Sequence, residues 1–139
     1  MVMLHSIWAF IVLAMLLIVV VKSFMSFNKN FTDIDLRLAL FTLIVSHIQL
    51  LLGLGVYFSS PAFKFIKENG MGAAMKDSNV RLLAVEHPLM MILAIILITV
   101  GFSKTKKETT SKGKFKKIAF LYGAALLLIL SIIPWGQWL

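Results

Sequence analysis

Long apolar runs separated by shorter polar connections dominate this chain. Residues 2–21, 38–60, 88–103 and 118–139 contain no Asp, Glu, Lys or Arg. A helix needs about 20 apolar residues to cross the hydrocarbon layer of a bilayer. Backbone polar groups in lipid must bond within the chain, so each run is expected to be a helix. The pattern therefore predicts an all-α integral membrane protein.

We expect one domain over residues 1–139, an up-down four-helix bundle. Its four transmembrane spans are predicted at about residues 3–22, 37–59, 80–102 and 117–137. The first run has no basic residues before it and is too long for the apolar region of a signal peptide. It is therefore expected to stay as a helix of the protein.

Composition supports the membrane assignment. Of the 139 residues, 60% are hydrophobic and 14% are charged, with a mean hydropathy of +0.93. A water-soluble domain has about 25% charged residues, and a disordered chain has low hydrophobicity, so both classes are excluded. The chain has no cysteine. Disulfides, iron–sulfur clusters and thiolate-bound or covalently attached haem are therefore excluded as well.

The net charge of +8 is unevenly distributed along the chain. Three basic residues lie between the first and second spans, seven between the third and fourth, and only four between the second and third. The positive-inside rule then predicts an inner (cytoplasmic) membrane protein with residues 104–117 in the cytoplasm and both termini outside. The lysines of this loop are typical of a segment that lies on anionic lipid. Because Phe115 is the only aromatic residue among them, no nucleic acid is expected as a partner.

Three histidines fall within the predicted spans. Ionisable groups at membrane depth are costly and point to function. At a rise of about 1.5 Å per residue, His5 and His87 lie ~5 and ~7 Å below the outer surface, and His47 lies near the midplane. In an up-down bundle, the first and third spans stand at diagonal corners, about 11–14 Å apart. We expect His5 and His87 to be axial metal ligands of one b-type haem (haem b), because two imidazoles at one level can hold a haem iron.

Other residues are candidates for the same cofactor site. Arg81 is placed to pair with haem propionates, and Ala9 and Ala84 would leave room for the ring. His47 and Gln49 are further candidate cofactor contacts. They lie about 160° apart around their helix, so one of them would face outward, which makes a homodimer a further expectation.

Alternatives remain for these polar groups. The histidines could serve as hydrogen-bonded packing residues, and copper or zinc would require additional ligands. His47 could instead form an interhelical hydrogen bond, or contact a proton path or a quinone.

Pro88 is expected to free the carbonyl of Ala84 and kink the third span beside His87. Glu86 is expected to pair with a basic residue or to reach water.

Three short motifs carry a family resemblance. Residues 4–10 read Leu-His-Ser-Ile-Trp-Ala-Phe, residues 49–53 read Gln-Leu-Leu-Leu-Gly, and residues 86–88 read Glu-His-Pro. They resemble helices of the haem A synthase family, whose members look like two fused four-helix halves, and this chain resembles one half. It is also similar to short four-span membrane proteins labelled cytochrome b. The resemblance implies that His5 and His87 hold the haem.

The catalytic motif of that family is incomplete here. The synthase helix reads Glu-x-x-His-Arg, whereas this chain has Val2 and Ser6 at the corresponding positions around His5. Independent catalytic activity is therefore not expected. The expected function is electron transfer near the outer face, with a quinone or a respiratory membrane protein as partner. The alternatives are a haem-free structural or assembly subunit and a haem-handling accessory protein.

Overall fold

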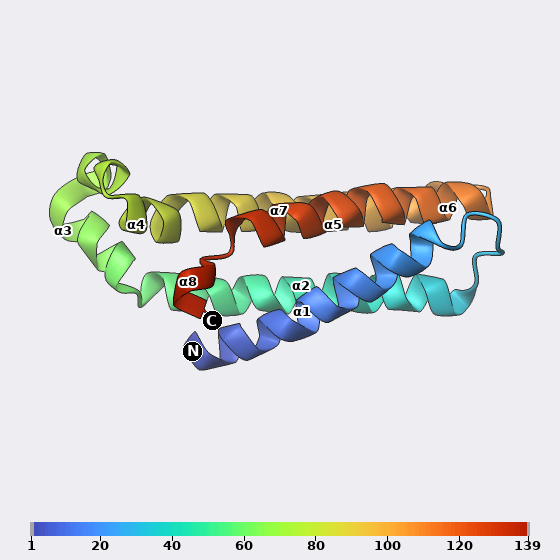
Figure 1. Ribbon diagram of the computed structural model, residues 1–139, viewed down its shortest axis with the longest axis horizontal. Helices are drawn as coiled ribbons and strands as arrows, with labels where there is room; N and C mark the ends of the chain where they lie inside the picture. Colours follow the sequence, from blue (N-terminus) through green and yellow to red (C-terminus); the bar gives the residue numbers. More distant parts are fainter. Residues whose placement is uncertain (1, 139) are drawn as a thin grey trace.

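The computed structural model describes residues 2–138, without the side chain of Trp138. Within this part of the chain, 88% of residues are helical and no strand occurs, which confirms the all-α expectation. Figure 1 shows the arrangement of the elements. They are α1 (Val2–Phe24), α2 (Asp33–Phe58), α3 (Pro61–Lys76), α4 (Ser78–Arg81), η1 (Leu82–Glu86), α5 (His87–Lys107), α6 (Ser111–Lys117), η2 (Ile118–Tyr122), α7 (Gly123–Ile132) and α8 (Trp135–Trp138).

Four helical stretches are long and apolar enough to cross a membrane: Val2–Phe24, Asp33–Phe58, Ser78–Lys107 and Ser111–Ile132. The third runs through α4, η1 and α5, and the fourth through α6, η2 and α7. The fourth was expected over residues 117–137 but starts earlier, because the lysine-rich segment is helical as well. It ends at Ile132 because Ile133 has an extended ψ of 133° and Pro134 follows.

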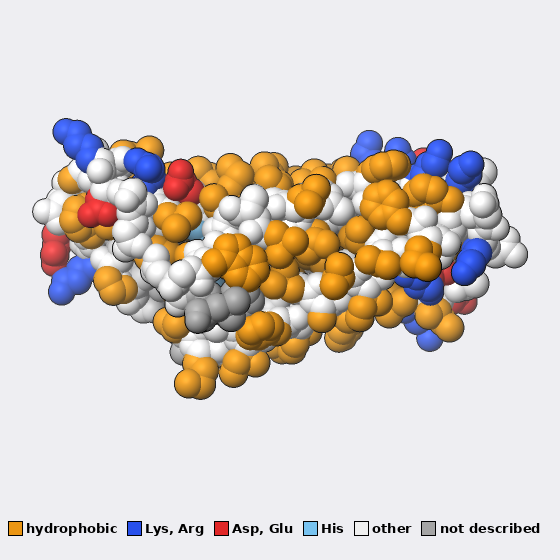
Figure 2. All heavy atoms as spheres, in the orientation of Figure 1, with side chains coloured by type: hydrophobic (Ala, Val, Ile, Leu, Met, Phe, Trp, Pro, Cys, Tyr) orange, Lys and Arg blue, Asp and Glu red, His pale blue; other side chains and the backbone are white. Residues whose placement is uncertain are grey.

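Each long helix packs on two neighbours. Helix α1 contacts α2 and η2, while α5 contacts α2, α7 and η2. Helices α1 and α5 therefore stand at diagonal corners of the bundle, as the up-down topology requires. Apolar side chains cover the middle of the molecule on the face in Figure 2, and charged side chains gather at its two ends. This distribution fits a bundle whose long axis crosses a bilayer.

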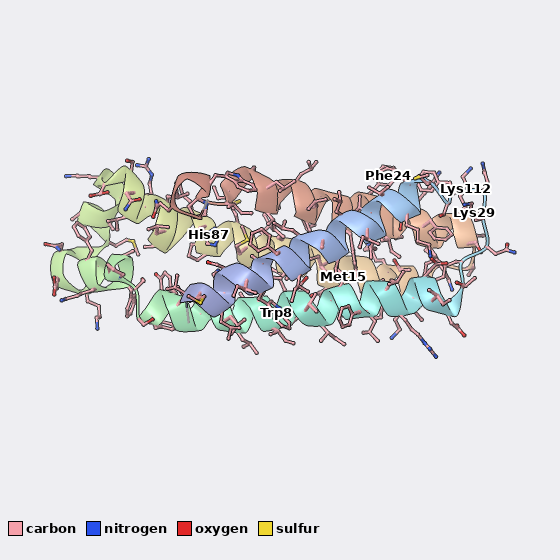
Figure 3. All side chains as sticks on the ribbon, turned by 60° about the horizontal axis from the view of Figure 1, so that its bottom comes forward. Trp8, Met15, Phe24, Lys29, His87 and Lys112 are labelled. Atoms are coloured by element: carbon pink, nitrogen blue, oxygen red, sulfur yellow. The ribbon has the colours of Figure 1, made fainter. Side chains whose placement is uncertain are left out.

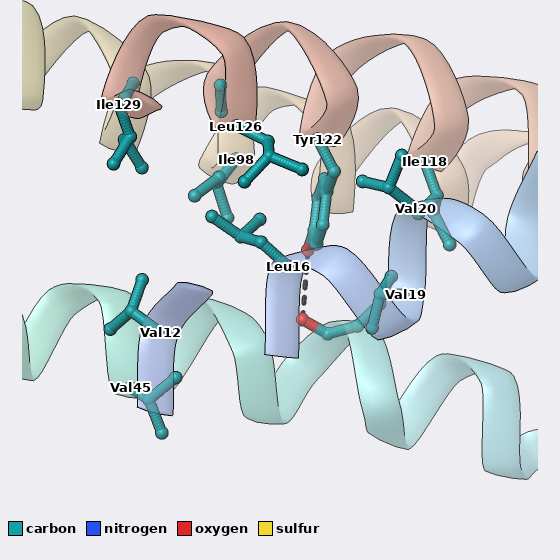
Figure 4. Packing of buried hydrophobic residues seen from close by; sticks show 13 residues of the cluster. Val12, Leu16, Val19, Val20, Val45, Ile98, Ile118, Tyr122, Leu126 and Ile129 are labelled. Atoms are coloured by element: carbon teal, nitrogen blue, oxygen red, sulfur yellow. Dashed lines mark hydrogen bonds between the residues drawn. The ribbon is translucent and has the colours of Figure 1, made fainter. Parts of the chain in front are cut away.

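Buried aliphatic side chains from all four long helices meet in one core (Figure 4). Tyr122 is fully buried there, and its hydroxyl donates a hydrogen bond to the carbonyl oxygen of Ala39 at 3.0 Å. Gly101 allows this side chain to approach, because a Cβ at Gly101 would lie 3.0 Å from Cδ1 of Tyr122 and 3.0 Å from Cβ of Leu121. The core thus depends on one small residue of α5 opposite one large residue of η2.

The connection between α2 and α5 forms a helical cap at one end of the bundle. Its first residues belong to α3, which begins at Pro61 and is kinked at Gly70 with a φ of +85°. The side chain of Asp77 then caps the start of α4 by accepting hydrogen bonds from the backbone of Asn79 and Val80. We call this the α3 end of the bundle.

The opposite end holds the connection between α1 and α2 and the lysine-rich segment that includes α6 (Figure 1). The backbone N–H of Phe31 donates to Oγ of Ser111 at 2.9 Å, which ties the first connection to α6. Lys22 of α1 forms an ion pair with Asp35 of α2. The first and third connections therefore lie at one end, as alternating spans require, and we call it the lysine-rich end.

Candidate functional site

His5 is held against α2 by two contacts. The side-chain nitrogen of Gln49 donates to the backbone oxygen of His5 at 2.9 Å. One turn further along α2, a Cβ at Gly53 would lie only 3.2 Å from Cε1 of His5. The imidazole of His5 therefore packs directly against the backbone at Gly53. A side chain at residue 53 would obstruct this position of the ring.

Gln49 and Gly53 belong to a face of α2 that is small and polar. Thr42 and Ser46 lie on the same face, and both are fully buried. Nearby, Nε1 of Trp8 donates to the carbonyl oxygen of Val45 at 2.8 Å, which links α1 to α2. A packing surface of small and polar residues is therefore present on α2, and its Gln49 contacts α1 at His5.

His87 comes from the diagonal helix at the same end of the bundle (Figure 3). Its Nδ1 lies 3.4 Å from the carbonyl oxygen of Ile132, at the end of α7. A histidine that donates from Nδ1 to a carbonyl keeps the lone pair of Nε2 free for a metal. This contact also fixes the direction of the ring.

The helix is wider than usual just before His87. Residues Leu82–Glu86 form a π-helical turn, and the N–H of His87 bonds to the oxygen of Leu82. Pro88 has no N–H to offer the carbonyl of Ala84, and the hydroxyl of Tyr57 donates to that oxygen at 3.0 Å. The hydrogen bond from Tyr57 is consistent with the expectation that Pro88 frees the carbonyl of Ala84. The sequence did not identify Tyr57 as the donor.

His5 near the start of α1 and His87 at the start of α5 both lie toward the α3 end of the bundle (Figure 3). Two polar atoms at this site lack a hydrogen-bond partner although they are buried. They are Nδ1 of the His5 ring and Oε1 of the Gln49 side chain. Buried polar atoms in proteins nearly always have a partner, so such exceptions point to a missing group. The site thus combines two imidazoles from diagonal helices with two unsatisfied polar atoms.

Arg81 and Glu86 lie at the outer edge of this site. Nε of Arg81 is 3.7 Å from a carboxylate oxygen of Glu86, and Nη1 donates to the oxygen of Met75 at 2.9 Å. A π-helical turn brings residues five apart onto one face, which explains this pairing. Glu86 therefore pairs with a basic residue, as expected, and its partner is Arg81.

The remaining candidates lie elsewhere. His47 is exposed on the outward face of α2, where its Nδ1 contacts the oxygen of Leu43 of the same helix at 2.8 Å. Ala84 packs in an apolar cluster with Ala62 and Ala74 of α3. Ala9 is half-buried on α1.

The structure thus brings His5, His87 and Gln49 to one end of the bundle. It turns His47 away from Gln49, as their angular separation around the helix required.

Within residues 2–138, no group of three or more histidine or acidic residues could hold a metal ion. The candidate metal ligands at this site are therefore the two imidazoles of His5 and His87. Comparisons with family models, curated proteins and solved structures find no match for this chain. The resemblance to the haem A synthase family consequently rests on its three short motifs.

Proposed function

We propose that this protein is a b-type cytochrome of the membrane, which holds one haem b between His5 and His87 and transfers electrons near the outer face. The observation that carries the proposal is the pair of histidines on diagonal helices at one end of the bundle, of which His87 has its Nδ1 directed at a backbone carbonyl. His5 and His87 would hold the haem iron through their imidazoles, and a haem held by two imidazoles would supply electron transfer.

The residues around the histidines fit such a cofactor. Gly53 lets the His5 ring lie directly against the backbone of α2, and the side chain of Gln49 holds the backbone of His5 by a hydrogen bond. Nδ1 of His5 and Oε1 of Gln49 are buried without a hydrogen-bond partner, so they are polar atoms that a bound group could satisfy. Haem, when bound, supplies one-electron redox chemistry, and these residues supply its orientation.

Arg81 has the role of a propionate partner in this proposal. Its guanidinium group is about one-third exposed at the outer edge of the site, where Glu86 and a backbone oxygen hold it. A guanidinium group can accept a carboxylate in a two-pronged geometry. Arg81 would therefore bind a haem propionate in exchange for its contact with Glu86.

The membrane setting and partners belong to the same proposal. The protein lies in the inner membrane with its lysine-rich end in the cytoplasm and exchanges electrons with a quinone or a respiratory membrane protein. The exposed imidazole of His47 supports contact with another polypeptide in the membrane, for which a second copy of this chain is the candidate. A polar group that faces lipid gains from such a contact.

An absorption spectrum tests the haem site directly. Full-length protein is purified in mild detergent from haem-replete cells, and spectra are recorded before and after reduction with dithionite. We expect a low-spin haem spectrum with a sharp Soret band that shifts on reduction. His5→Ala and His87→Ala should each abolish it, whereas His47→Ala, the matched control on the outward face, should leave it unchanged.

The outcomes separate the competing functions. Colourless protein that is folded by circular dichroism would overturn the proposal in favour of a haem-free structural or assembly subunit. Haem that is lost on gel filtration would indicate a haem-handling accessory protein. An unaltered spectrum for His87→Ala would exclude His87 as a ligand.

A further inference from the structure

A groove lies on α1 at the lysine-rich end, far along the bundle from the two histidines. Its volume is roughly 710 Å³. It is lined by residues of α1, of the connection to α2, of the start of α2 and of α6: Leu17, Ile18, Val21, Lys22, Met25, Ser26, Lys29, Asn30, Thr32, Asp35 and Phe115. Neither the haem ligands nor Arg81 contribute to it.

The lining of the groove changes from apolar to polar along the axis of the bundle. Toward the middle of the molecule lie Leu17 and Ile18, whose side chains are 55% and 53% exposed. Toward the lysine-rich end lie Ser26, Lys29 and Asn30. In a bilayer this order matches the order of a phospholipid, whose acyl chains lie deeper than its phosphate.

The charges of the groove favour an anion. The single carboxylate, on Asp35, is only 7% exposed and accepts hydrogen bonds from Lys22 and from the backbone and hydroxyl groups of Thr32. Its charge is therefore compensated within the protein. Lys29 is exposed and forms no ion pair with any residue that the structure describes, and Figure 3 shows it at the tip of this end. The mouth of the groove thus has one ammonium group available for a ligand.

We propose that this groove binds one anionic phospholipid, with its phosphate at Lys29 and an acyl chain along Leu17 and Ile18. Apolar area binds the chain, and the uncompensated ammonium group selects a headgroup with net negative charge over a zwitterionic one. The proposal does not depend on the haem, because no residue of the groove belongs to the histidine site.

A fluorescent reporter can test this site. All three tryptophans of the chain belong to α1 near its start or to α8, at the other end of the bundle. A tryptophan introduced by Ile18→Trp therefore reports on the groove once the signal of the parent chain is subtracted. The full-length variant is reconstituted in phosphatidylcholine vesicles that contain the same mole fraction of brominated phosphatidylglycerol or brominated phosphatidylcholine.

We expect brominated phosphatidylglycerol to quench this signal at least two-fold more strongly. Lys29→Ala should remove the difference, and Lys107→Ala, which removes an exposed lysine at the same end but outside the groove, should retain it. Millimolar inorganic phosphate should not restore the fluorescence, because free phosphate lacks the acyl chain. As a second measurement, native mass spectrometry of the unmodified chain should show one retained phosphatidylglycerol.

Two results would overturn the proposal. Equal quenching by the two brominated lipids would mean that the groove does not select an anionic headgroup. An equal loss for Lys29→Ala and Lys107→Ala would mean that the overall positive charge of this end, and not the groove, attracts the lipid. If Ile18→Trp does not fold, native mass spectrometry of the unmodified chain decides. The absence of a retained phosphatidylglycerol would then overturn the proposal.

Discussion

Single residues determine how closely groups approach at the candidate haem site. Gly53 is the clearest case, because the imidazole of His5 occupies the space beside its Cα. The four-residue spacing of Gln49 and Gly53 puts both on one face of the helix, but spacing alone does not show that this face lies against His5. That relation depends on the rotation of α1 about its axis, which packing determines.

Gly53→Val should therefore displace the His5 ring. A Cβ at this position lies 3.2 Å from Cε1 of His5, and overfilling a packed site costs about 1–3 kcal/mol. We expect the purified variant to lose most of its low-spin haem signal. Gly123→Ala is the matched control, since its Cβ would make an ordinary contact of 3.6 Å with Val20. A full haem signal in Gly53→Val would show that haem binding does not require the His5 ring to lie against residue 53.

At the scale of helical elements, the two π-helical turns are the features that local propensity did not predict. Pro88 favoured an irregularity near His87, and the structure has a π-helical turn at Leu82–Glu86 within a continuous helix. The second turn, Ile118–Tyr122, has no proline. It carries Tyr122 into the core, where α5 approaches closely at Gly101.

Gly101→Val should separate α5 from η2. Even a Cβ would lie 3.0 Å from Cβ of Leu121, which cannot move without its backbone. We expect a loss of at least about 1–3 kcal/mol in the free energy of unfolding, measured by titration with a denaturing detergent. Gly72→Ala on α3 is the control, because nothing lies within 4 Å of its added Cβ. Equal stability of the two variants would show that the close approach is not needed.

At the scale of the whole molecule, the distribution of charge predicts how the bundle is inserted. The connection between α1 and α2 and the lysine-rich segment that includes α6 lie at one end, and α3 lies at the other (Figure 1). Juxtamembrane lysines remain on the cytoplasmic side during insertion. The orientation is therefore a property of the whole chain and not of any one helix.

Because the chain has no cysteine, its orientation can be measured with single introduced thiols. Asn69 of α3 and Thr109 between α5 and α6 are both exposed. In intact spheroplasts, a membrane-impermeant maleimide should label Asn69→Cys, whereas Thr109→Cys should react only after permeabilisation. The reverse pattern would show that the lysine-rich end faces outward.

The apolar runs were sufficient to predict four helices, because a chain in lipid has no other way to satisfy its backbone. Periodicity also placed Gln49 and His47 on different faces of one helix, and the structure has them so. The ends of the helices were less predictable. The helical segment around Lys114 and Lys116 lies where charge suggested a loop, since lysine is compatible with a helix.

Pairings between distant residues were decided by tertiary packing. The contact between His87 and the oxygen of Ile132 spans 45 residues, and the bond from Tyr57 to Ala84 spans 27. A periodic pattern shows which face of a helix is apolar, but not how that helix is rotated and shifted against its neighbours. Those two quantities depend on how side chains of different size fit together, and they decide which groups the His5 and His87 rings contact at the end of the bundle where the alternating spans place both.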